Sequence, residues 1–209
     1  MSPLIETLTG IIIHLISSSG YLGIFVLMFL ESVFVPIPSE VTMPFSGFLA
    51  ASGQLSFILV VLVGAFANLA GSIVGYYIGF FLEERVIINI IKRYGKIFLV
   101  TEEDFHTSKK WFDKYGDKIV FISRLLPGVR TFISLPAGLF EMDIKKFSIY
   151  TFAGSLIWSF ALTYVGFTAG KNWKVLEPIF RKLEIGIGVL AILAILFYIN
   201  HKLKIVKFK

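Results

Sequence analysis

Residues 29–47 read FLESVFVPIPSEVTMPFSG, and residues 121–138 read FISRLLPGVRTFISLPAG. Both stretches are apolar and broken by proline, which ends or kinks a helix because it lacks an N–H and clashes with the preceding turn. The charged residues are Glu31 and Glu40 in the first stretch and Arg124 and Arg130 in the second. Because ionisable residues at membrane depth are costly and usually functional, the two stretches predict a polar site between two broken hairpins.

The composition places both stretches in a membrane protein. The 209 residues are 56% hydrophobic and 16% charged, with a mean hydropathy of +0.81, which is typical of integral membrane chains. Cysteine is absent, so disulfides and thiolate chemistry are excluded. The net charge of +6 comes from bases that flank apolar segments. We therefore expect cytoplasmic anchoring by the positive-inside rule rather than nucleic-acid binding.

The apolar pieces around the breaks are too short to cross a bilayer separately. A spanning helix needs about 20 apolar residues, so we predict re-entrant hairpins at residues 21–53 and 119–140. Irregular backbone is tolerated at membrane depth only where protein or a water-filled cavity surrounds it. The predicted hairpin breaks are Pro36, Pro38, Pro127, Gly128 and Pro136.

Longer apolar runs predict transmembrane helices at residues 55–82, 147–170 and 185–200. The first run carries glycines on one face, and small residues allow another helix to approach closely. The predicted packing glycines are Gly71, Gly75, Gly79 and Gly138. Asn68 is the strongly polar residue of the first run, and we interpret it as a packing hydrogen bond.

The charge distribution predicts an orientation. All 20 lysines and arginines lie at or after Arg85, and the N-terminus lacks the basic start of a cleaved signal peptide. We expect residues 83–118, an amphipathic loop, to lie on the cytoplasmic side together with the C-terminal tail. This arrangement requires that residues 119–140 do not cross the membrane.

The two halves of the chain correspond. Residues 21–82 and 119–170 each consist of a broken hairpin followed by a helix that ends in glycine, and the predicted orientation inverts one half relative to the other. The predicted fold is one all-α integral membrane domain, residues 1–209, built from an inverted repeat plus a C-terminal helix. Inverted repeats are common in secondary transporters, whose sites lie near the midplane.

The charges suggest a chemistry for this site. Four unpaired charges would cost on the order of 10 kcal/mol, so they must pair with one another or face water. Buried salt bridges that hold the hairpins together are one interpretation. In the other, the forked guanidinium groups of Arg124 and Arg130 bind phosphate oxygens in pairs. Glu31 and Glu40 would then exchange protons as they compete for the arginines.

The patterns FLE…PxPSE, GxxxGYYxG and FxxRxxPxxRxxxxxPAG resemble those of the DedA family, which shares the VTT (SNARE-associated) domain. The resemblance covers about residues 20 to 170. It implies a lipid transporter or scramblase with two facing re-entrant hairpins. Bacterial members are implicated in returning undecaprenyl phosphate across the plasma membrane, and some in proton-dependent envelope homeostasis. By resemblance, the functional acids are Glu31 and Glu40, and the functional bases are Arg124 and Arg130.

The sequence therefore predicts a multi-pass protein of a prokaryotic plasma membrane that translocates an anionic polyprenyl phosphate, with proton coupling as an added hypothesis. The alternatives are an uncoupled phospholipid scramblase, a proton-dependent small-ion transporter and, less favoured, a membrane lipid phosphatase. The three histidines are isolated, and no phosphate-binding loop or metal-ligand spacing occurs. We expect no enzyme activity, cofactor or nucleic-acid partner; a homo-oligomer is compatible with the sequence.

Overall fold

The computed structural model describes residues 3–35, 37–82, 86–89, 92–93, 102–126 and 129–170. Within these ranges the chain is all-helical and contains no strand. This agrees with the predicted all-α class. The predicted C-terminal span and three of the predicted hairpin breaks, Pro36, Pro127 and Gly128, lie outside the described residues.

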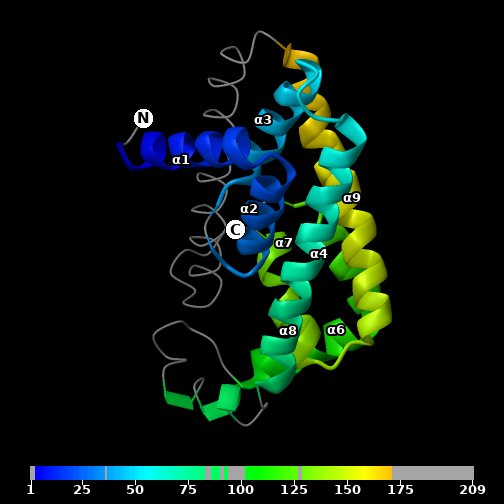
Figure 1. The fold of residues 1–209 in the computed structure, drawn as a ribbon. Helices are drawn as coiled ribbons and strands as arrows, with labels where there is room; N and C mark the ends of the chain where they lie inside the picture. Colours follow the sequence, from blue (N-terminus) through cyan, green and yellow to red (C-terminus); the bar gives the residue numbers. More distant parts are fainter. Residues whose placement is uncertain are drawn as a thin grey trace, which may run out of the picture.

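Two long helices form the axis of the molecule. α4 (Phe57–Phe81) and α9 (Ile144–Ala169) are long and apolar enough to cross a membrane. At 1.5 Å per residue they measure about 37 and 39 Å, compared with about 30 Å of hydrocarbon. They run side by side in opposite directions (Figure 1). Their bounds lie within a few residues of the apolar runs at 55–82 and 147–170.

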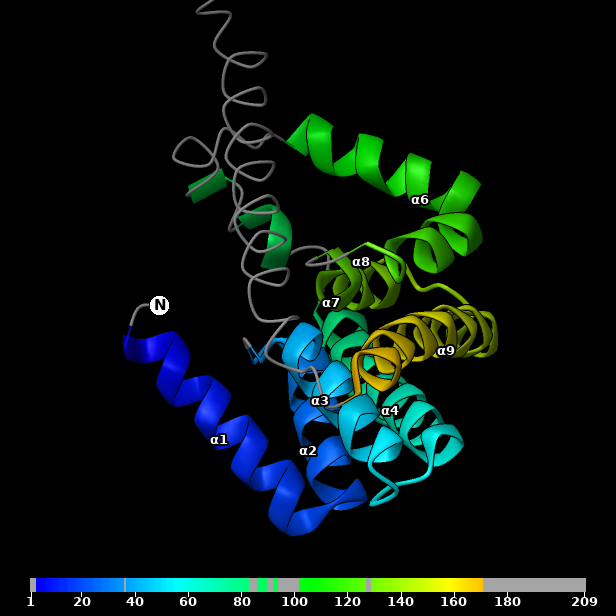
Figure 2. The same cartoon turned by 90° about the horizontal axis from the view of Figure 1, so that it is seen from above.

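The first broken element forms two short helices. α2 (Tyr21–Ser32) and α3 (Ser39–Ala51) are separated by an irregular segment that ends at Pro38. Before them, α1 (Pro3–Ser19) extends sideways from the bundle (Figure 2). It packs against α2 and α3, and its buried residues Ile12 and Ile16 join the same apolar core.

The second broken element is more fragmented. α6 (Glu102–Ser123) is followed by two short helices, α7 (Val129–Phe132) and α8 (Ser134–Leu139). The predicted boundary between the loop and the hairpin, at residue 118, falls inside α6, because the helix continues past Gly116 as far as Ser123. α6 lies at an angle to the long helices, beside the bundle on the side of α7 and α8 (Figure 2).

Glycines bring α8 into backbone contact with α4. A Cβ atom added to Gly138 would overlap the carbonyl oxygen of Tyr76, and one added to Gly79 would overlap the carbonyl oxygen of Leu135. Only glycine allows such an approach, because every other residue places a Cβ in the gap. Gly138 therefore faces the carbonyl group of the residue three positions before Gly79, and Gly79 faces the carbonyl group of the residue three positions before Gly138.

The same contact occurs between α3 and α9. A Cβ atom on Gly47 would overlap the carbonyl oxygen of Thr163, and one on Gly166 would overlap that of Pro44. Here too, each glycine faces the carbonyl group of the residue three positions before the other glycine. The second short helix of each broken element thus packs on the long helix of the other half of the chain, in matching register.

Candidate functional site

Buried polar residues gather at the middle of the bundle. Asn68 and Ser72 lie within one turn of the midpoint of α4, and Ser155 and Ser159 lie within one turn of the midpoint of α9. Along α4, one apolar core contains Val60 and Ala67 and the other contains Tyr76. The polar belt, as we call it, lies between these cores. Its members are Glu31, Ser32, Ser39, Asn68, Ser72, Arg124, Arg130, Ser134 and Trp158.

Arg130 forms the centre of one charged group. Its Nη2 atom donates to Glu31 Oε1, in an ion pair, and to Ser39 Oγ. Ser39 Oγ in turn donates to Glu40 Oε2 at 3.3 Å. Arg130 and Glu31 are 5% and 8% exposed, whereas Glu40 is only partly buried. The chain thus brings both predicted acids and one predicted base into a single network.

The Arg130 guanidinium also has an aromatic neighbour. It lies 5.3 Å from the ring centroid of Trp158 on α9, within the range of a cation–π interaction. The indole Nε1 atom of Trp158 is buried and has no hydrogen-bond partner. Arg130 is therefore held by an acid, a hydroxyl and an aromatic ring from three different helices.

Arg124 has a different environment. Its Nη1 atom donates to Ser72 Oγ at 2.8 Å and its Nη2 atom to Ser134 Oγ at 3.0 Å, while its guanidinium lies 5.8 Å from the Phe147 ring centroid. Arg124 is 3% exposed. Among the described residues, no carboxylate pairs with it, its Nε atom has no partner, and Arg130 is near enough to repel it electrostatically. It is a buried cation held by neutral groups.

Asn68 takes the packing role predicted for it. Its Oδ1 atom accepts a hydrogen bond of 2.8 Å from Ser32 Oγ on α2, while its Nδ2 atom has no partner. The neighbouring Gly71 brings the two helices together, since an added Cβ would overlap the carbonyl oxygen of Phe29. Gly75 lies next to the side chains of Ser134 and Phe34, which an added Cβ would approach to 3.1 and 3.3 Å.

The remaining predicted residues lie on α4 and α8 or next to α3. Pro38 precedes the first residue of α3, and Pro136 lies inside α8, three residues before its end. Gly79 and Gly138 form the α4–α8 contact described above. The described residues contain no group of three histidine, aspartate or glutamate side chains that could hold a metal.

Sequence reasoning missed the hydroxyl groups. Ser39, Ser72 and Ser134 are fully buried and donate to or accept from the charged groups. A single serine in an apolar helix carries little signal, but Ser72 follows Asn68 by four residues and shares its face. That spacing of polar residues, at the middle of an otherwise apolar run, could have identified it.

The comparisons with known proteins identify the family of this chain. The sequence profile of the VTT domain matches residues 37–168, more than half of the chain. The chain belongs to the VTT domain family. Undecaprenyl phosphate transporter A of Staphylococcus aureus is 31% identical over 188 residues, which cover 90% of this chain and 93% of the relative. Protein DedA of Escherichia coli is 29% identical over 188 residues, 87% and 83% of the two chains.

A further relative has a different kind of name. The alkaline phosphatase-like protein of Lactococcus lactis is 33% identical over 197 residues, 92% of each chain. No solved structure matches the chain. The family and the names of the transporter relatives indicate a DedA-type membrane transporter rather than an enzyme, and a bacterial membrane as its location. The resemblance to the DedA family is confirmed.

Proposed function

We propose that this chain translocates a polyprenyl phosphate, undecaprenyl phosphate in particular, across a bacterial plasma membrane. Relatives of nearly equal length carry that substrate in their names. The phosphate would bind at the polar belt between Arg124 and Arg130, while the prenyl chain remains in the lipid. The observation that carries this proposal is the state of Arg124, a buried guanidinium whose hydrogen-bond partners among the described residues are two serine hydroxyls.

The energetics of Arg124 favour an anionic ligand. An arginine at the centre of a bilayer costs about 3 kcal/mol or more, and removing the partner of a buried charge costs about 3–5 kcal/mol. Two serine hydroxyls do not neutralise the charge. A phosphate group would supply both the countercharge and oxygen acceptors for the Nη and Nε donors. If Arg124 had only a structural role, an apolar residue in its place would serve the stability of the protein as well or better. Arg124 is therefore better explained by the binding of an anionic ligand.

The two arginines would act at different stages. Arg130 is already paired with Glu31 and hydrogen-bonded to Ser39. A phosphate that binds Arg124 would therefore compete with Glu31 for Arg130. Protonation of Glu31 would release Arg130 to the phosphate, and loss of the proton would return Arg130 to Glu31. Glu40, connected through Ser39, would serve as the second proton-exchanging group. This competition would couple lipid movement to a proton.

The arrangement of helices supports two facing re-entrant hairpins. α2 and α3 measure about 18 and 20 Å, well short of the roughly 30 Å of a hydrocarbon layer. Each half of the chain places its second short helix on the long helix of the other half, through glycines with the same offset. An inverted repeat would produce this correspondence. It would also place the polar belt near the midplane, where transporters of this kind bind their substrates.

The direct test is transport in reconstituted vesicles. Labelled undecaprenyl phosphate is followed across proteoliposomes that contain the wild-type chain or the variants Arg124→Gln, Arg124→Lys and Arg130→Gln. The glutamine variants lose the charge, and the lysine variant keeps the charge but loses the planar fork of the guanidinium. The transport rate of all three variants should therefore fall at least about tenfold, the equivalent of one charge-assisted hydrogen bond. Arg93→Gln removes an exposed arginine outside the belt and should leave the rate unchanged. Wild-type rates in Arg124→Gln and Arg130→Gln would refute the anion site.

Additional arms separate the alternatives. Equal rates with and without a pH gradient would remove the proton coupling but leave the binding site. Equal transport of phosphatidylglycerol and undecaprenyl phosphate in competition would indicate an uncoupled scramblase. Proton-driven uptake of small ions without lipid movement would indicate an ion transporter. Release of inorganic phosphate from the lipid would indicate a phosphatase.

A further inference from the structure

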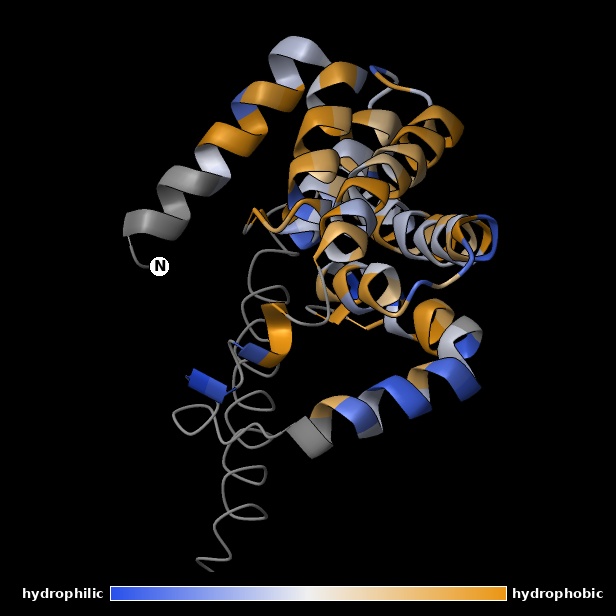
Figure 3. Ribbon diagram, turned by 90° about the horizontal axis from the view of Figure 1, so that it is seen from below, coloured by the Kyte–Doolittle hydropathy of each residue, from blue (hydrophilic) through white to orange (hydrophobic). Residues whose placement is uncertain are grey.

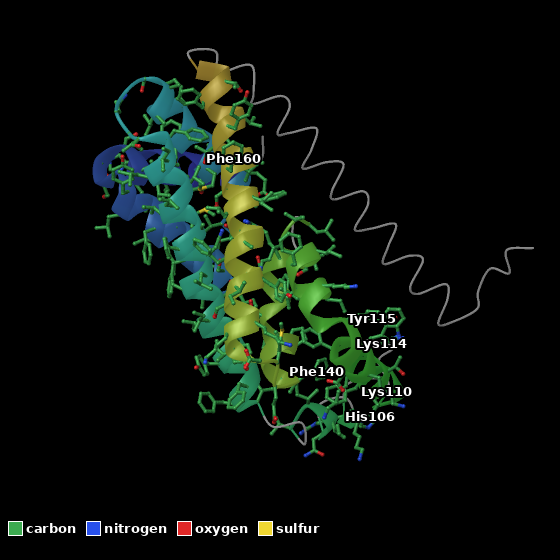
Figure 4. The ribbon with its side chains drawn as sticks, turned by 90° about the vertical axis from the view of Figure 1, so that its right-hand side faces the viewer. His106, Lys110, Lys114, Tyr115, Phe140 and Phe160 are labelled. Atoms are coloured by element: carbon green, nitrogen blue, oxygen red, sulfur yellow. The ribbon has the colours of Figure 1, made fainter. Side chains whose placement is uncertain are left out.

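A pocket outside the polar belt lies at one end of the bundle. It has a volume of about 450 Å³ and is lined by the second half of α6, the turn between α8 and α9, and the first turn of α9. Figure 4 shows Phe140 between α6 and the base of α9, with Tyr115 and Lys114 farther along α6. The proposed transport mechanism uses none of these residues.

The bottom of the pocket is apolar. Phe112 and Met142 are buried, and Phe140 is partly buried. The Phe140 ring lies between two other rings, with centroids 5.4 Å from Phe112 and 5.6 Å from Phe105. These ring contacts pack α6 against the turn and form the apolar floor of the pocket.

The rim of the pocket is charged. Lys114 and Lys118 of α6 and Lys146 of α9 line it, together with Asp113 and Glu141. Lys114 also lies 5.0 Å from the ring centroid of Tyr115. A rim with three ammonium groups and two carboxylates complements a ligand that carries a negative charge and hydrogen-bond donors at once, because the lysines can donate to the charge and the carboxylates can accept from the donors.

The surface around the pocket has the pattern expected at the depth of lipid headgroups. Toward the bundle, exposed apolar side chains begin directly after the charged part of α6, with Ile122 at 55%, and continue with Ile149 of α9 and Phe81 of α4. Away from the bundle, α6 is mostly hydrophilic (Figure 3) and exposes Trp111 at 60%. Tryptophan is enriched at membrane–water interfaces. The border between apolar and charged surface therefore passes through the pocket.

We propose that this pocket binds the headgroup of an anionic glycerophospholipid whose headgroup bears hydroxyl groups, the chemistry of phosphatidylglycerol. The phosphate accepts from Lys114, Lys118 and Lys146, and the hydroxyls donate to Glu141 and Asp113. The acyl chains pass over the apolar floor and along the exposed apolar faces of the bundle. The bound lipid holds α6 at the surface of the leaflet. This site does not rest on the proposed transport of polyprenyl phosphate.

The experiment measures lipid selectivity by electron paramagnetic resonance. The full chain is reconstituted in phosphatidylcholine with trace spin-labelled phosphatidylglycerol or spin-labelled phosphatidylcholine, and the fraction of label immobilised by the protein is compared. The wild type should prefer phosphatidylglycerol by about fivefold or more, the selectivity expected from one favourable lysine contact near a membrane surface. The triple variant Lys114→Gln/Lys118→Gln/Lys146→Gln should lose this preference, and the corresponding triple arginine variant should keep it.

A matched control separates a built pocket from diffuse attraction. The variant Lys109→Gln/Lys110→Gln/Lys145→Gln removes the same number of positive charges from α6 and from the first turn of α9. None of these three lysines lines the pocket. It should retain the preference. An equal loss in both glutamine triples, or no preference in the wild type, would overturn the proposal. Transport of undecaprenyl phosphate in vesicles of phosphatidylcholine alone should be unchanged in the pocket variant, so failure of the lipid site and failure of the transport site are distinguishable.

Discussion

The ion pair between Arg130 and Glu31 allows a quantitative test by a double-mutant cycle. Glu31→Gln leaves the buried guanidinium of Arg130 with Ser39 and the Trp158 ring but without a countercharge. Breaking a buried pair from one side costs about 3–5 kcal/mol, and Arg130→Gln should cost a similar amount. The double variant replaces both charges with amides that can hydrogen-bond to each other, so it should cost about 1 kcal/mol. The coupling energy is then about 5 kcal/mol or more.

Thermal unfolding of the purified protein in detergent measures these differences. For a chain of this size, 1 kcal/mol corresponds to about 2–4 °C, so each single variant should lower Tm by roughly 6–20 °C and the double variant by only a few degrees. Glu40→Gln is the matched control: because Glu40 is partly exposed, its loss should cost about 1 kcal/mol or less. If the effects of Glu31→Gln and Arg130→Gln add in the double variant, the pair carries no coupling and the reasoning is wrong.

The same variants distinguish a structural from a functional ion pair. If the pair only holds the helices together, the stable double variant should transport lipid. If Arg130 binds phosphate, the double variant should be folded but inactive in proteoliposomes. The combination of recovered Tm and lost transport would therefore support the functional interpretation by itself.

Three further changes test the packing. Gly138→Ala forces a methyl group into a backbone carbonyl of α4 and should lower the stability of the protein by about 1–3 kcal/mol. The control Gly10→Ala, with open space around Gly10, should be neutral or stabilising by up to about 1 kcal/mol. Equal Tm shifts in the two variants would contradict the close contact. Tyr76→Phe removes the buried hydrogen bond of 2.5 Å to the Met142 carbonyl and should cost about 1–3 kcal/mol, and an unchanged Tm would disprove that bond. Asp143→Ala removes the side chain that accepts from the backbone N–H of Lys146 at the start of α9, so about 1 kcal/mol should be lost, while Asp143→Asn should restore most of the lost Tm.

The sequence was sufficient to predict the helices that follow from long apolar runs. α4 and α9 were predicted to within a few residues, because an uninterrupted apolar run of that length has few alternatives. It also predicted that acids and bases meet, since the cost of isolated charges in lipid requires it. The confinement of Glu31, Arg124 and Arg130 to a buried belt follows from the same cost.

The assignment of partners could not be predicted. Whether Glu31 pairs with Arg124 or Arg130 depends on how the chain turns after α6, and the two arginines are separated by the broken segment. The four-residue helix α7 has no pattern of its own, and its place is fixed by contacts with distant residues. The buried serines were missed for a related reason: a hydroxyl can satisfy itself within its own helix, so its partner is decided by the fold.

The glycine-mediated contacts of α3 with α9 and of α8 with α4 have a consequence for biosynthesis. Gly47 leaves the ribosome more than a hundred residues before Gly166, a delay of about ten seconds at ordinary elongation rates. During that interval the nascent α3 is in the translocon or the bilayer without the helix that covers it, and its polar side chains have no companions from the second half. Translation must therefore reach α9 before α3 can assume its native packing, whereas α1, α2 and α4 can pack on one another earlier.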